Sequence, residues 1–190
     1  EGVAGIAAQA NGATISGCIN CAEISATERY VGGIVGKMGG GTVENCYNTG
    51  AISSSRDRKG VNLGGIAGYI DSNGFVKNCY NSGAISCVAA SQVAKLVGWN
   101  AGSTIKNCYY LGDKESEGAN GYNYTDPTQP KTADEMKSPA FAALLGDGFM
   151  VKSGDYPALK WETPTAAVRF TIAPANATLE INGGTYTGST

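Results

Sequence analysis

Cysteine is the residue type in this chain with the most varied chemistry, and two of the six cysteines stand close together. Cys18 and Cys21 form a CxxC pair, a spacing that can bind zinc or support redox exchange. No second CxxC accompanies it, and the 190 residues contain no histidine. Because zinc sites, HExxH peptidases and triad hydrolases rely on imidazole, we predict neither a metal site nor a cofactor.

Carboxylates are the second group that could do chemistry, since polysaccharide lyases and hydrolases need several of them on one face. Of the candidates, only Glu44 falls within an expected strand, whereas Asp71 belongs to the turn DSNG. We therefore predict no catalytic residue and no enzyme. A carbohydrate-active β-helix, with the acids of residues 113–117 facing a groove, stays as the alternative. The candidates are Glu44, Asp71, Asp113, Glu115 and Glu117.

The elements that would position these residues repeat along the chain. NCYNTGAIS at 45–53 recurs as NCYNSGAIS at 78–86, and two divergent copies complete four units of roughly 30 residues, which is typical of a stacked-repeat architecture. Each unit holds three short apolar pieces separated by Gly and Asn turns, as in one coil of a parallel β-solenoid. We predict an all-β fold, a right-handed parallel β-helix of about four three-stranded coils.

Stacking would turn each repeat position into a column with a spacing of roughly 4.8 Å. Three columns of branched apolar residues are expected to point inward and form the core. They are Ile6, Ile34, Ile66 and Leu96; Ile15, Val43, Val76 and Ile105; and Ile24, Ile52 and Ile85.

Two further columns have structural roles. The matched cysteines are expected to be buried and reduced, because parallel side chains keep Cβ atoms further apart than the roughly 3.8 Å of a disulfide. The asparagines before them are expected at a left-handed corner, with amides bonded along the stack and Gly17 in the first unit. The columns are Cys18, Cys46, Cys79 and Cys108, and Asn45, Asn78 and Asn107.

Tyr47, Tyr80 and Tyr109 form the one column with binding potential. If the cysteines point inward, these rings point outward and stack on a flat face. Exposed aromatic side chains pack on sugars or on proteins, so the column is a candidate ligand-binding face for a host or environmental glycan or protein. The interpretation that we favour is a ladder that only stiffens the sheet.

The pattern GGIVG...G.V.NCYN.G.I resembles the GLUG-motif repeats of bacterial secreted and surface proteins over about residues 3–111. Such repeats occur in large adhesin-like proteins and beside metallopeptidase domains that cleave immunoglobulin A. The resemblance implies an extracellular location and a non-catalytic role as adhesin module or stalk, with an accessory region of a secreted peptidase as a further alternative. Ala4 and Lys95 depart from the glycine pattern, which indicates end coils.

After the repeats at 1–111, we predict a cap at 112–162 and a further segment at 163–190. Thr132 with Glu135, and Ser138 before Pro139, predict a helical turn and then a short helix ending near Leu145. Four apolar residues of these helices are expected to cover the open end of the solenoid, with residues 154–162 adding a last strand. They are Met136, Phe141, Leu144 and Leu145.

Residues 163–190 show alternating apolar positions, at Val168, Phe170 and Ile172 and again at Ala177, Leu179 and Ile181. They resemble the start of a bacterial immunoglobulin-like module, with Thr163-Pro164 as its boundary. We interpret the chain, which runs from Glu1 to TYTGST, as a fragment.

The net charge of −2 gives no reason to expect nucleic acid as a partner, and no apolar run of about 18 residues predicts a membrane span. We expect a monomer.

Overall fold

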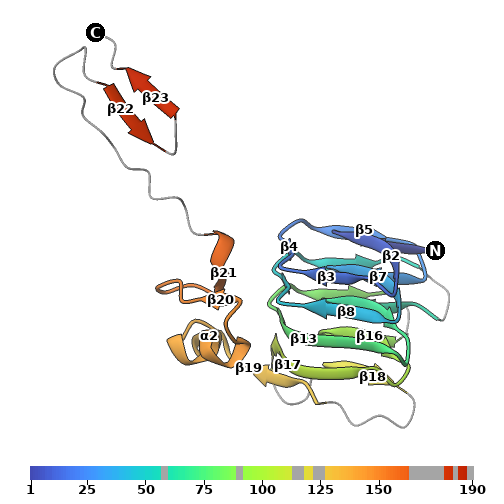
Figure 1. The fold of residues 1–190 in the computed structure, drawn as a ribbon. Coiled ribbons are helices and arrows are strands. Elements are labelled where there is room, and N and C mark those ends of the chain that lie inside the picture. Colours follow the sequence, from blue (N-terminus) through green and yellow to red (C-terminus); the bar gives the residue numbers. More distant parts are fainter. Residues whose placement is uncertain are drawn as a thin grey trace.

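The computed structural model describes residues 1–56, 60–88, 92–112, 118–121 and 127–162, together with the backbone of residues 178–181 and 184–187. The chain forms a parallel β-solenoid of about four turns, with two short α-helices towards its C-terminal end (Figure 1). The prediction of an all-β parallel solenoid is therefore confirmed.

The strands follow one another in the same order in each coil. The first coil consists of β1 (Gly2–Ala4), β2 (Ala7–Asn11), β3 (Thr14–Ser16), β4 (Ile19–Asn20) and β5 (Ile24–Ala26). The second consists of β6 (Tyr30–Gly32), β7 (Val35–Gly39), β8 (Gly41–Glu44), β9 (Tyr47–Asn48) and β10 (Ile52–Ser54).

The later coils merge some of these strands. The third coil consists of β11 (Asn62–Gly64), β12 (Ala67–Ile70), β13 (Gly74–Asn81) and β14 (Ile85–Cys87). The fourth consists of β15 (Gln92–Ala94), β16 (Val97–Asn100) and β17 (Thr104–Leu111), and β18 (Ala119–Gly121) and β19 (Gln129–Lys131) follow it.

Equivalent strands of successive coils pair in parallel and build four sheets. We call them sheet I (β1, β6, β11, β15), sheet II (β2, β7, β12, β16, β18), sheet III (β3, β4, β8, β9, β13, β17, β19) and sheet IV (β5, β10, β14). The apolar piece at the start of a unit was expected to be one strand. It forms two, because the chain bends at a glycine pair such as Gly32-Gly33, where a Cβ would meet backbone atoms of neighbouring strands.

The predicted columns are confirmed by the register of the strands. Val76 pairs with Val43 and with Ile105, and Ile52 pairs with Ile24 and Ile85. Side chains from sheets II and III fill one core, and those from sheets I and IV fill a second. Burying each large aliphatic side chain stabilises the fold by about 1.5–3 kcal/mol.

Ile6 does not share the burial of its column. Ile34, Ile66 and Leu96 are fully buried, whereas Ile6 is 46 % exposed, so its predicted place in the core is wrong. The reason is its position in the first coil, where no strand of the described residues lies on its outer side. In a stack, a side chain is buried only where a neighbouring coil covers it.

The asparagine corner is confirmed. Asn45, Asn78 and Asn107 have φ values of 51°, 54° and 51°, and Gly17 has 63° in the first coil. The Asn107 amide donates to the Asn78 side-chain oxygen at 3.1 Å, and the Asn78 amide donates to that of Asn45 at 3.3 Å. This ladder lies along the outer corner of sheet III.

The cysteine column is confirmed as well. Cys46, Cys79 and Cys108 are buried, Cys18 is partly buried, and all six thiols are free. The Cys46 thiol donates to the Glu44 carbonyl at 3.1 Å, and Cys79 and Cys108 repeat the same contact one and two coils further on. Burial raises the pKa of the Cys79 thiol well above its ordinary value.

A second asparagine ladder, which we did not predict, runs through the interior. Asn20 donates to Asn48 and Asn48 donates to Asn81, both at 2.7 Å, and all three side chains are buried. Each amide also donates to a backbone carbonyl two residues later, which satisfies its remaining proton. The ladder ends at the fourth coil, where Tyr110 occupies the position and the Asn81 amide donates to the Lys95 carbonyl.

The predicted helices are confirmed. The capping box of Thr132 and Glu135 starts α1 (Ala133–Met136), and Ser138 caps α2 (Pro139–Leu145) at 3.3 Å from the Phe141 amide. Two short antiparallel strands follow, β20 (Phe149–Met150) and β21 (Ala158–Leu159), and then a 3₁₀ turn at Lys160–Glu162. We call residues 132–162 the cap.

The place of the cap differs from the prediction. Its helices lie beside the stack, against sheet III, and not over the end of the solenoid (Figure 1). Leu144, expected in the contact, is 47 % exposed, and β21 pairs with β20 instead of extending the solenoid. The stack itself continues with β18 and β19 to Lys131, so the solenoid ends later than the predicted residue 111.

The backbone of the C-terminal segment forms a hairpin of β22 (Thr178–Ile181) and β23 (Gly184–Thr187). The predicted strand around Leu179 and Ile181 is therefore present. The predicted strand at 168–172 and the boundary at 163–164 lie outside the described residues, and the immunoglobulin-like module stays a prediction. No helix in the described part of the chain is long and apolar enough to cross a membrane.

Candidate functional site

The tyrosine column lies on the outer side of sheet III, as predicted. Each tyrosine follows an inward cysteine, and the register pairs Tyr80 with Tyr47 and with Tyr109. The rings of Tyr47 and Tyr80 are stacked with centroids 4.7 Å apart and planes 5° from parallel. The geometry of the ladder is thus the expected one.

The prediction that this column is an exposed face is wrong. Tyr47, Tyr80 and Tyr109 are only 6 %, 0 % and 5 % exposed, because the cap covers them. Phe141 meets the rings of Tyr80 and Tyr109 edge-on at 5.8 and 5.3 Å. The cap side chains that complete this cluster are Met136, Leu145, Phe149 and Leu159.

Burial of this column follows from its own chemistry. A flat ladder of aromatic rings is a large apolar surface, and the cap carries an apolar helix face that must also be buried. Each covers the other. The tyrosine column could bind a ligand only if the cap moved away from sheet III.

Polar contacts fasten the cap to individual coils. The Tyr80 hydroxyl donates to the Pro157 carbonyl at 2.6 Å, and the Tyr47 hydroxyl donates to the Glu162 carboxylate at 2.8 and 3.0 Å. The indole N–H of Trp161 donates to the Gly17 carbonyl at 3.0 Å. The cap therefore contacts the first, second and third coils at defined points.

The phenols have raised pKa values as a consequence. For Tyr47, burial is the main cause of the raised pKa, and the Glu162 carboxylate beside its hydroxyl raises it further. For Tyr80, burial again comes first, followed by the neighbouring Tyr47. Both side chains are neutral donors at physiological pH.

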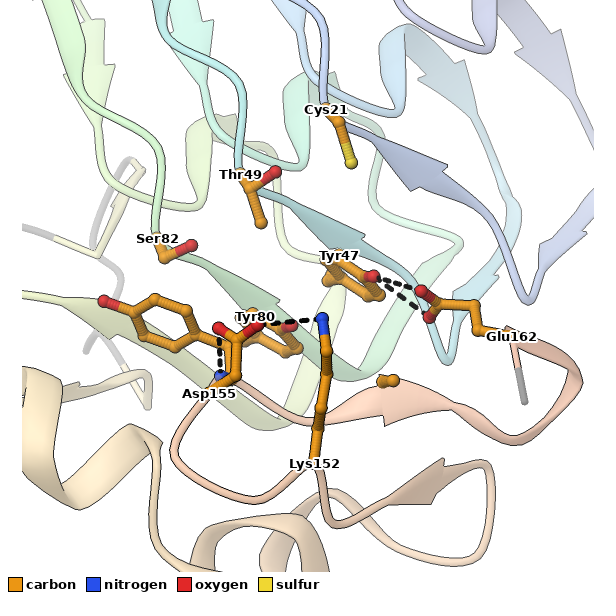
Figure 2. A pocket seen from close by; sticks show the side chains of 10 residues that line it. Cys21, Tyr47, Thr49, Tyr80, Ser82, Lys152, Asp155 and Glu162 are labelled. Carbon is orange, nitrogen blue, oxygen red and sulfur yellow. Dashed lines mark hydrogen bonds and ion pairs between the residues drawn. The ribbon is translucent and has the colours of Figure 1, made fainter. Parts of the chain in front are cut away.

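A groove of about 470 Å³ opens between sheet III and the cap, next to Tyr47 and Tyr80 (Figure 2). Lys152 and Asp155 form an ion pair at 2.8 Å on its cap side, and Cys21, Thr49 and Ser82 line its solenoid side. The remaining lining residues are Tyr156, Ala158 and Glu162.

Both carboxylates of the groove are already bound by the protein. Glu162 accepts from the Tyr47 hydroxyl and from the Leu159 amide at 2.6 Å. Asp155 pairs with Lys152 and accepts from the Tyr156 amide at 2.8 Å. In this arrangement each acid fixes the conformation of the cap, and Lys152 and hydrogen bonds lower the pKa of Asp155.

Of the predicted acidic candidates, the two within the described residues each have a local partner. Glu44 forms an ion pair with Lys77 at 2.7 Å on sheet III. Asp71 closes its own turn, with the Gly74 amide at 2.9 Å from the Asp71 carbonyl. Asp113, Glu115 and Glu117 lie outside the described residues.

The CxxC pair is divided between two environments. The Cys18 thiol donates to the Ser16 carbonyl at 3.3 Å, whereas Cys21 is exposed and lines the groove. Within the described ranges, no three residues among His, Cys, Asp and Glu are grouped as metal ligands.

Sequence reasoning missed the groove. The segment that holds Lys152, Asp155 and Glu162 contains no repeats, and only the three-dimensional structure shows that it lies beside Tyr47. The one usable signal was the apolar character of the cap, which required a partner surface.

By its fold, the chain is a parallel β-solenoid built from about four stacked sequence repeats. The family model of the GLUG motif matches residues 27–53, which span the second coil, so the resemblance is confirmed. GLUG motifs are found in proteins of the surface and secreted type. No curated protein and no solved structure matches the chain.

Proposed function

We propose that this chain is a non-catalytic segment of a bacterial cell-surface or secreted protein, acting as a stalk or as an adhesin module. The observation that carries the proposal is the state of the groove: both of its carboxylates are held by hydrogen bonds and an ion pair from the same chain. A glycosidase needs one carboxyl group free to donate a proton and a second that faces the substrate.

The interior of the solenoid supports the stalk role. Two asparagine ladders and the apolar columns join each coil to the next, so that a change of register would break all of them together. In such a stack each coil adds about 4.8 Å of length. The result is an extended body whose length depends on the number of repeats.

Two alternatives stay open. The first is a carbohydrate-active β-helix with the acids of residues 113–117 facing a groove, and these residues lie outside the described ranges. In the groove beside Tyr47, catalysis would require Asp155 and Glu162 to exchange their structural partners for a substrate. The second is an accessory repeat region of a larger secreted peptidase, which the family resemblance suggests. In every case we expect an extracellular, monomeric segment.

The proposal is tested by incubating the purified chain with a panel of neutral and acidic polysaccharides and with a peptide library. Products are followed by mass spectrometry beside a boiled sample and an Asp155→Asn/Glu162→Gln variant. We expect no turnover above the boiled sample. Turnover that the double variant abolishes would establish the enzyme instead.

A further inference from the structure

A second aromatic column lies on the outer side of sheet II, away from the cap. The strand register aligns Gln9 with Lys37, Lys37 with Tyr69, and Tyr69 with Trp99. Gln9 is exposed and the other three are partly exposed. The next residues along, such as Met38, point inward into the core.

Tyr30 of sheet I joins this column at the corner between sheets I and II. Its ring lies edge-on to Tyr69 with centroids 5.4 Å apart. Glycines allow the approach, since a Cβ on Gly68 would collide with the backbone of Val31 and Asn62. We call Tyr30, Lys37, Tyr69 and Trp99, with Arg29 beside them, the aromatic corner.

Two cations lie at this corner. The Lys37 ammonium is 5.3 Å from the ring centre of Tyr30 and 5.8 Å from that of Tyr69, and the Arg29 guanidinium is 5.2 Å from that of Tyr30. Among the described residues, neither cation has a carboxylate within ion-pair distance. Burial raises the pKa of Tyr69, and the negative charge of Asp71 is the next cause.

We propose that the aromatic corner binds an acidic saccharide, in which sugar rings pack on Trp99 and Tyr69 and a sugar carboxylate binds Arg29 and Lys37. Aromatic faces are the usual platform for the apolar face of a sugar, and charge-assisted hydrogen bonds recognise a carboxylate. The exposed Gln9 amide, further along the column, offers a donor and an acceptor for hydroxyls. The site rests on the adhesin form of the proposed function and names its ligand class.

Charge favours a saccharide over a nucleic acid. Aromatic rings with cations also bind single-stranded nucleic acids, but such sites follow the backbone with a positively charged groove. Here the corner has two cations, Asp71 lies at its edge, and the whole chain carries a net charge of −2. A sugar ring that carries its own carboxylate can contact an aromatic side chain and a cation together, which fits this arrangement better than a row of phosphates.

Tryptophan fluorescence provides the test, because the chain has only two tryptophans. A Trp161→Phe variant leaves Trp99 as the only reporter, and Trp161 lies in the cap, away from the corner. This variant is titrated with an oligogalacturonate, with a neutral galactan oligomer of the same length, and with oligothymidylate. We expect a saturable change in Trp99 emission with the oligogalacturonate, and affinities at least roughly tenfold weaker for the other two.

Variants locate the site by calorimetric titration. Arg29→Gln, at an exposed residue, is expected to weaken binding of the acidic oligomer roughly tenfold, the effect of losing one charge-assisted hydrogen bond. Trp99→Ala is expected to weaken it at least as much, whereas Lys106→Gln on sheet III serves as the matched control and should bind normally. Circular dichroism verifies that each variant is folded.

The inference is overturned by no saturable binding of the oligogalacturonate, by equal binding of the neutral oligomer, or by a preference for oligothymidylate. It is also overturned if Arg29→Gln and Trp99→Ala bind like the wild type, since the corner would then only be a packing cluster. None of these results touches the non-catalytic proposal, which the turnover assay tests separately.

Discussion

Replacing Tyr80 by phenylalanine removes a single hydroxyl from the centre of the tyrosine column and is expected to loosen the cap. That hydroxyl donates to the Pro157 carbonyl at 2.6 Å, and the Tyr80 side chain is fully buried. Pro157 is also buried, so its carbonyl would lose its donor without gaining water. Leaving such a group unsatisfied costs about 1–3 kcal/mol. For a chain of this size the Tm would fall by roughly 2–12 °C.

Tyr109→Phe is the matched control. Tyr109 lies one coil further along the same column and is 5 % exposed, but its hydroxyl has no hydrogen-bond partner among the described residues. Both variants are made in a Trp99→Phe background, which leaves Trp161 as the only tryptophan and as the reporter on the cap. Urea denaturation is then followed by fluorescence and by circular dichroism. We expect a clear loss for Tyr80→Phe and a change below about 0.5 kcal/mol for Tyr109→Phe. Equal stability of Tyr80→Phe and the wild type would refute the reasoning.

The phenols, the asparagine ladders and the thiols each allow a further prediction. Tyr47 and Tyr80 have raised pKa values when folded, so their contribution to stability is complete below about pH 10 and declines as the pH rises towards the folded pKa. The free energy of unfolding from urea denaturation should therefore be lower at about pH 11 than at about pH 8. Replacing both tyrosines by phenylalanine should reduce this difference. Asn48→Ala breaks the buried ladder on both sides and should lower the free energy of unfolding, measured by urea denaturation, by about 3 kcal/mol or more. Asn107→Ala, at the end of the outer ladder, should lower it by about 1 kcal/mol. In thiol labelling of the folded protein, read by mass spectrometry, the exposed Cys21 should react, whereas the buried Cys46, Cys79 and Cys108 should react only after urea is added. Fast labelling of these three thiols without urea would contradict their burial.

The repeated part of the fold could be predicted because local patterns and stacking carry the same information. Ile34 and Ile66 recur at the spacing of the coil, and a coil cannot bury them without its neighbours. Asn45 and Asn78 precede a cysteine in each copy, at a corner that only Asn or Gly adopts readily. Side-chain direction then follows from alternation along the strand.

The cap and the site could not be predicted in this way. Whether Tyr80 faces water or protein depends on a segment some 60 residues later, and nothing local in the sequence says which surface Phe141 covers. The first coil shows the same limit, since Ile6 has the residue type of its column but no strand among the described residues covers it.

The aromatic corner was not predicted, because its residues differ from one repeat to the next. Lys37, Tyr69 and Trp99 follow equivalent glycines in successive repeats, yet they are three different residue types. A search for identical repeated residues passes over them. Only the register of sheet II shows that they form one column.

In this structure the cap covers the tyrosine column, whereas Arg29 is exposed and Tyr69 and Trp99 of the aromatic corner are partly exposed. Hydroxyl-radical footprinting with mass spectrometry tests this difference most directly, because it reports the solvent exposure of individual aromatic side chains. We predict slow oxidation of Tyr47, Tyr80 and Tyr109, rapid oxidation of Trp161, which is 64 % exposed, and an intermediate rate at Trp99. Oxidation of Tyr80 as fast as that of Trp161 would contradict the account.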